Sequence, residues 1–89
     1  MTTYSERADD LCDKLRDLEH QADDGDQLFY CAYLLGLLGL HSAAEGEGNV
    51  AFDQYFEETL KDTLNAENVS EQDQENILGL WHQVIAELA

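Results

Sequence analysis

The chain has 89 residues, which is enough for one domain with one modest hydrophobic core. Its 20 acidic and 4 basic residues give a formal net charge of −16, which excludes nucleic acid and anionic membrane surfaces as partners. Because the chain contains no proline and few valine or isoleucine residues, we expect a single all-α domain over residues 1–89.

The first predicted helix covers residues 5–21. Thr3 and Glu6 have the spacing of a capping box at its start. Apolar residues recur along it at alternating steps of four and three, which predicts one face packed against other helices. The opposite face is acidic and carries Asp10, Asp13 and Asp17.

A turn at residues 22–26 separates the first predicted helix from the second, which covers residues 27–44. Gly25 is expected to adopt the positive φ that ends a helix, and Asp26 is expected to cap the next one. Glycine commonly ends a helix because it tolerates positive φ. Aspartate commonly caps one because its short carboxylate accepts hydrogen bonds from free backbone N–H groups.

The second predicted helix is apolar on every side. No residue from Leu28 to Leu40 is charged, yet the run is shorter than the roughly 20 residues that a bilayer span requires. It is therefore predicted to be the most deeply buried helix, with Gly36 and Gly39 allowing a neighbouring helix to approach closely. A second subunit covering an exposed remainder of this helix is the alternative.

Two more helices are predicted at residues 50–64 and 70–88. Asn49 is expected to cap the third helix, and Ser70 the fourth. Short loops between four amphipathic helices favour an up-and-down bundle. The predicted core contains Leu11, Leu15, Phe29, Leu34, Leu38, Phe56, Leu60, Ile77 and Trp81.

The sequence contains no recognisable catalytic constellation. Cys12 and Cys31 are expected to be buried thiols, too far out of register for a disulfide. Nucleophile, phosphate-binding and dinucleotide-binding motifs are absent, so we predict neither enzymatic activity nor a cofactor. His41 and Glu45, four residues apart at a helix end, are weak candidates for metal ligands, and solvated acids and helix caps are the better explanation of these carboxylates.

The acidic face of the first helix has a functional interpretation and a simpler one. Carboxylates at Asp10, Asp13 and Asp17 lie roughly 5–6 Å apart along a helix, near the spacing of successive phosphates, which would suit a DNA mimic. A solvated helix face explains the same pattern without a partner, and Arg16 interrupts the acidic stripe.

The predicted second and fourth helices contain a spaced set of residues: Leu28-Phe29, Tyr33-Leu34, Gly36, Ser70, Asp73-Gln74 and Trp81. In these residues the chain resembles the YfcL family of small bacterial proteins. This resemblance implies a helical fold and a bacterial, cytoplasmic origin, and it implies no particular activity.

Taken together, these patterns predict a cytoplasmic, non-enzymatic interaction module. It would dock a basic or apolar protein surface, with a homodimer as one form, because the chain combines strong negative charge with an unusually apolar second helix. The alternative from the residues is a metal- or small-ligand-binding bundle with weak hydrolytic activity that uses His41 and Glu45. A DNA mimic is the third reading.

Overall fold

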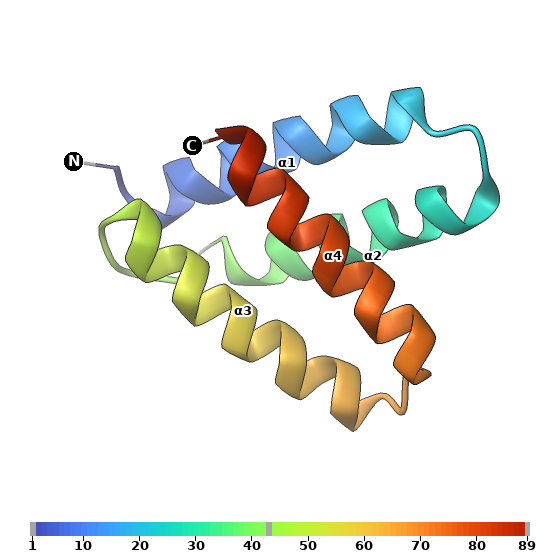
Figure 1. Ribbon diagram of the computed structural model, residues 1–89. Helices are drawn as coiled ribbons and strands as arrows, with labels where there is room; N and C mark the ends of the chain where they lie inside the picture. The colour runs from blue at the N-terminus through green and yellow to red at the C-terminus, as the bar shows by residue number, and fades with distance from the viewer. Residues whose placement is uncertain (1, 43, 89) are drawn as a thin grey trace.

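The computed structural model describes residues 2–42 and 44–88, most of which lie in four α-helices (Figure 1). The all-α prediction is confirmed, and each predicted helix exists within three residues of its expected bounds. Among the described residues, β structure is limited to one isolated bridge between Thr3 and Glu47. The helices are α1 (Tyr4–Gln21), α2 (Gly25–His41), α3 (Asn49–Ala66) and α4 (Glu71–Leu88).

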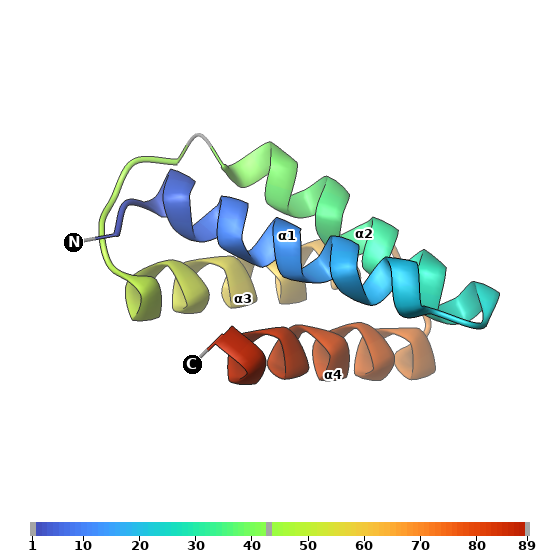
Figure 2. The same cartoon turned by 90° about the horizontal axis from the view of Figure 1, so that it is seen from above.

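Successive helices alternate in direction, as expected for an up-and-down bundle. In both views α2 returns beside α1, and α4 runs back against the direction of α3 (Figure 1, Figure 2). The second pair is inclined to the first in Figure 1, and α4 packs against both α1 and α2. The apolar faces of the four helices therefore enclose one shared core.

The core contains eight of the nine residues predicted for it. Trp81 is fully buried, and its ring centroid lies 4.7 Å from that of Phe56. Phe29 is the exception, because 50% of it is exposed on the outer side of α2. The confirmed core residues are Leu11, Leu15, Leu34, Leu38, Phe56, Leu60, Ile77 and Trp81.

Two of the predicted helix caps are confirmed. The Thr3 hydroxyl accepts a hydrogen bond from the Glu6 N–H at 3.1 Å, and the Glu6 carboxylate accepts one from the Thr3 N–H at 3.4 Å. This reciprocal pair is the predicted capping box. At the start of α4, the Ser70 hydroxyl accepts from the Asp73 N–H at 3.2 Å.

The other two predicted caps are wrong. Asp24 caps α2, since its carboxylate accepts from a backbone N–H of the first turn at 2.7 Å, and Asp26 already lies inside the helix. Gly25 is the first helical residue and does not end α1 with a positive φ. At α3 the cap is Gly48, with φ of 104°, so Asn49 is the first helical residue.

α2 has the largest share of buried residues, 5 of 17 against 5 of 18 in α1, but it is buried on one side only. A bundle of four short helices gives each helix neighbours on one side, so even a helix apolar all round must expose the other. None of the helices in the described ranges is both long and apolar enough to cross a membrane. The buried residues of α2 are Tyr30, Cys31, Leu34, Leu37 and Leu38.

Candidate interaction surface

The side of α2 that points away from the bundle is uncharged and apolar. Leu40 is 78% exposed, Phe29 is 50% exposed and Leu28 is 42% exposed. At 100° per residue these side chains share one arc of the helix with the exposed small residues between them. We call the following six residues the α2 face: Leu28, Phe29, Ala32, Gly36, Gly39 and Leu40.

The two glycines of the α2 face have no packing partner in their own bundle. Beyond its chain neighbours and the backbone of its own helix, a Cβ added at Gly36 or at Gly39 would meet no atom of the described residues within 4 Å. The prediction that they admit a neighbouring helix of the same chain is therefore wrong, because this side of α2 faces solvent. A glycine within a helix costs about 0.5–1 kcal/mol relative to alanine, and the packing of this chain does not offset that cost.

Every lysine and arginine is already paired with a carboxylate of the same chain. Arg7 donates two hydrogen bonds to Asp53, at 3.0 and 2.8 Å, and the two side chains are only 7% and 14% exposed. The remaining carboxylates therefore have no lysine or arginine left to neutralise them. The other three pairs of a lysine or arginine are Lys14–Glu87 at 3.8 Å, Arg16–Asp13 at 3.2 Å and Lys61–Glu57 at 3.5 Å.

The predicted acidic face lies on α1. Asp10, Asp13 and Asp17 are all exposed. The Arg16 guanidinium pairs with Asp13, the middle member of the three, at 3.2 Å. This pair interrupts the row of free carboxylates, so the face offers negative charge without a regular phosphate-like repeat.

His41 is held by aromatic side chains of α3. Its Nδ1 lies 2.9 Å from the Tyr55 hydroxyl, and its ring meets that of Phe56 edge-on. The predicted pairing of His41 with Glu45 needed a helix that continued to residue 44, but α2 ends at His41. Across residues 2–42 and 44–88, no group of three or more His, Cys, Asp or Glu side chains is arranged to hold a metal ion.

Comparison with protein families gives a match over nearly the whole of this helical chain. A family model described as YfcL protein covers residues 2–86. The chain belongs to the YfcL family. The resemblance seen in the second and fourth helices is confirmed and now includes α1 and α3. No match was found among curated proteins or among solved structures.

The residues that carried the resemblance occupy distinct places in this YfcL-family chain. Leu28, Phe29 and Gly36 belong to the exposed α2 face. Ser70 caps α4, and Trp81 lies in the core. The residues that carry the family resemblance therefore lie in the interior, at a helix end and on the candidate surface. They do not line one common cleft.

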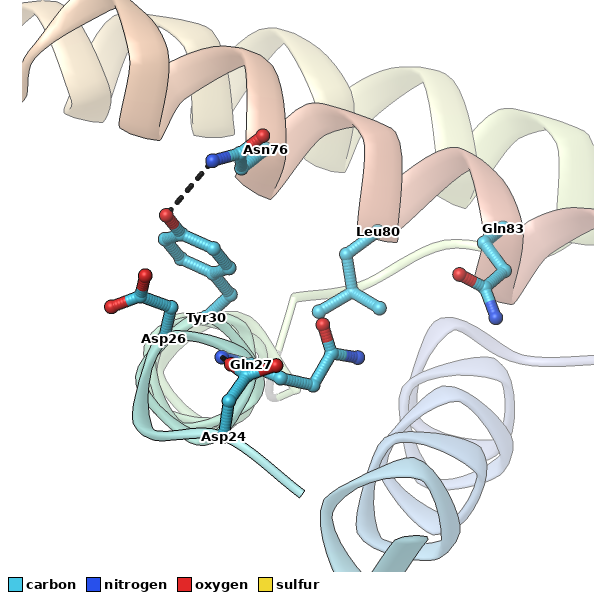
Figure 3. A pocket seen from close by; sticks show the side chains of 7 residues that line it. All are labelled: Asp24, Asp26, Gln27, Tyr30, Asn76, Leu80 and Gln83. Atoms are coloured by element: carbon cyan, nitrogen blue, oxygen red, sulfur yellow. Dashed lines mark hydrogen bonds between the residues drawn. The ribbon is translucent and has the colours of Figure 1, made fainter. Parts of the chain in front are cut away.

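A polar cavity of about 370 Å³ lies between the start of α2 and the middle of α4 (Figure 3). It is lined by two carboxylates, that of Asp24 at the cap of α2 and that of Asp26 in its first turn, and by amides of both helices. The Tyr30 hydroxyl donates to Asp73 at 2.9 Å and accepts from Asn76 at 2.9 Å. Tyr30 thus joins α2 to α4, and its hydroxyl is used within the fold in both its donor and acceptor roles.

The two cysteines are free and buried, as predicted. Burial raises the pKa of the Cys12 thiol and of the Cys31 thiol above its ordinary value of 9.0. A raised pKa keeps a thiol in its protonated, weakly nucleophilic form at neutral pH. Neither sulfur is therefore prepared for nucleophilic attack or for binding a metal ion.

Sequence reasoning kept an exposed part of the second helix only as an alternative, and it missed the buried pair of Arg7 and Asp53. Signals for both were present. Arg7 lies four residues before Leu11 and so falls on the apolar stripe of α1, where a cation needs a buried partner. An 89-residue domain has too little material to surround one helix completely, which predicts an exposed side for the apolar helix.

Proposed function

We propose that this chain is a non-enzymatic protein–protein interaction module that binds its partner through the α2 face. The observation that carries the proposal is the exposure of Leu40, Phe29 and Leu28 together on one uncharged side of a helix. Contiguous exposed apolar residues on a folded domain commonly mark a binding surface. Fully burying one such side chain contributes roughly 1.5–3 kcal/mol.

The acidic residues around the α2 face restrict the charge that a partner surface can carry. Surplus carboxylates repel an acidic protein and favour a partner surface that is neutral or basic around an apolar centre. The exposed acids of α1, Asp10, Asp13 and Asp17, are the candidate contacts for a basic rim. Such rim contacts weaken as salt is added, whereas burial of the α2 face does not.

The state of the reactive groups supports a non-enzymatic role. The thiols of Cys12 and Cys31 are buried with raised pKa values, and the Tyr30 hydroxyl is engaged by two side chains of α4. General acid–base and nucleophilic catalysis both need such a group free at a cavity and tuned near neutral pH. Neither thiol lines the polar cavity, and the Tyr30 hydroxyl that does is already engaged.

A capture experiment with two matched variants tests this function. The tagged chain is incubated with bacterial lysate containing untagged copies, at low and at high salt. Leu40→Glu places a charge in the α2 face, whereas Val50→Glu makes the same change at a 70% exposed position on α3. We expect Leu40→Glu to abolish capture and Val50→Glu to preserve it. Equal capture by both variants would contradict the proposal.

The metal-binding alternative has its own check. His41 is hydrogen-bonded to Tyr55, and Glu45 lies beyond the end of α2. Metal analysis of the protein as purified is expected to find no stoichiometric zinc, iron or manganese. A stoichiometric metal that disappears in His41→Ala would replace the interaction module by a metal-binding bundle.

A further inference from the structure

We infer that the partner on the α2 face is a second copy of this chain, with the two α2 helices antiparallel about a two-fold axis between Ala32 and Gly36. This inference rests on the proposed interaction function and names the occupant of its surface. Charge selects the side on which two copies can meet, and the shape of that side suits a second copy.

Charge identifies the α2 face as the side where two copies can meet. No residue from Gln27 to Ser42 is charged, whereas α1, α3 and α4 all carry exposed carboxylates. Each copy bears a net charge of −16, and its lysine and arginine side chains already pair internally. Contact on another side would place surplus carboxylates against each other, while two α2 faces bring no charges together.

The shape of the α2 face is complementary to itself. Phe29 and Leu40 lie three turns apart on the same side, roughly 16 Å along the axis, with Ala32 and Gly36 between them. In the antiparallel pair, Phe29 of one copy lies beside Leu40 of the other, and Ala32 lies beside Gly36. Large side chains then fill the two ends, while small residues at the crossing let the helix axes approach closely.

The size of the surface predicts a weak and reversible dimer. α2 has 17 residues, so its face is about 25 Å long and one helix wide. One helix face buries less than the roughly 800 Å² per partner of a standard stable interface. Dimerisation should therefore depend on protein concentration, and its dissociation constant should lie in the micromolar range or above, about 10⁻⁶ M at the tightest.

Salt and a matched pair of glycine variants test the inference on the full chain. Sedimentation velocity should show monomers converting to dimers as concentration rises, more readily at about 0.5 M than at about 0.05 M salt, because salt screens the repulsion between two acidic copies.

Gly36→Glu should raise the dissociation constant of the dimer by about tenfold or more. Gly79→Glu adds the same charge at another helical glycine with open space, on α4, and should leave dimerisation unchanged.

A dilution series followed by NMR gives a second measurement. Amide shifts that change with concentration should concentrate on the α2 face and spare Asp10, Asp13 and Asp17. A monomer at every concentration, open-ended oligomers, shifts centred on α1, or equal effects of Gly36→Glu and Gly79→Glu would overturn the inference. If the chain stays monomeric while Leu40→Glu still abolishes capture of another protein, the proposed function survives without the dimer.

Discussion

At the residue scale, two of the polar contacts between different elements of the bundle give testable predictions. Arg7 on α1 binds Asp53 on α3 through two hydrogen bonds in a largely buried setting. Tyr33 on α2 donates to Glu67 beyond the end of α3 at 2.8 Å. Each contact joins defined atoms, so removing one partner should change the free energy of unfolding in a predictable way.

Removing the carboxylate from the Arg7–Asp53 pair should destabilise the fold strongly. Asp53→Asn leaves a buried guanidinium without its counter-charge, which we expect to cost about 3 kcal/mol in the free energy of unfolding. Asp13→Asn breaks an exposed pair with Arg16 and should change that free energy by less than about 1 kcal/mol. Urea denaturation of both variants measures the difference. Equal losses of unfolding free energy in Asp53→Asn and Asp13→Asn would show that Arg7 is solvated.

Tyr33 predicts a loss of stability at alkaline pH. Burial, followed by the hydrogen bond to Glu67, raises the pKa of Tyr33 from 10.0 to about 12. Because the folded state holds the phenol proton more tightly than the unfolded state, this contribution is complete below pH 10.0 and disappears as the pH rises to about 12. In Tyr33→Phe the decline between these pH values should be shallower. An identical decline in both proteins would remove Tyr33 as its cause.

At the element scale, the helices were predictable and the orientation of one of them was not. The apolar stripe of α1 identifies its buried side, and the capping residues Thr3 and Ser70 are local signals that hold in the structure. The apolar α2 offers no contrast between its sides, so Phe29 could not be separated from Leu34 by periodicity. Its orientation comes from contacts distant in sequence, such as Tyr30 with Asp73.

The cap errors have a related cause at the same scale. Asp24 and Asp26 are equally good capping residues, and which one caps α2 depends on where the chain leaves α1. Gly48 at the start of α3 adopts a φ of 104° that suits glycine, which moves the helix start to Asn49. Capping preferences read from the sequence therefore locate the start of each helix to within a few residues. The conformation of the preceding loop decides which residue is the cap.

Replacing glycine by alanine should have opposite effects on stability at helical positions and at a constrained loop position. A Cβ at Gly36 or Gly79 meets open space, so Gly36→Ala and Gly79→Ala should each stabilise the fold by about 0.5–1 kcal/mol. A Cβ at Gly46 would lie 2.5 Å from the Tyr4 ring, so Gly46→Ala should destabilise it. Thermal denaturation of the three variants at low protein concentration checks these signs. Destabilisation by Gly36→Ala would indicate packing on that side of α2.

At the scale of the whole molecule, charge and apolar surface are segregated. Acidic residues are exposed on α1, α3 and α4, while the exposed side of α2 carries none from Leu28 to Leu40. The charge disfavours contact between acidic surfaces, and the α2 face is the exposed side without charge. The proposed interaction through that face, combined with repulsion elsewhere, would limit association to a small assembly.

The surplus charge should also make the fold itself sensitive to salt. With a net charge of −16 and the basic side chains already paired, the folded chain is destabilised by repulsion among carboxylates, which salt screens over a Debye length of about 10 Å at 0.1 M. We expect the urea midpoint of the Gly36→Glu variant, chosen because this change should prevent the proposed dimerisation, to rise with salt, most steeply below about 0.15 M. Neutralising the α1 acids in Asp10→Asn, Asp13→Asn and Asp17→Asn together should flatten this dependence. A midpoint that does not change with salt in either protein would mean that repulsion contributes little to the stability of this fold.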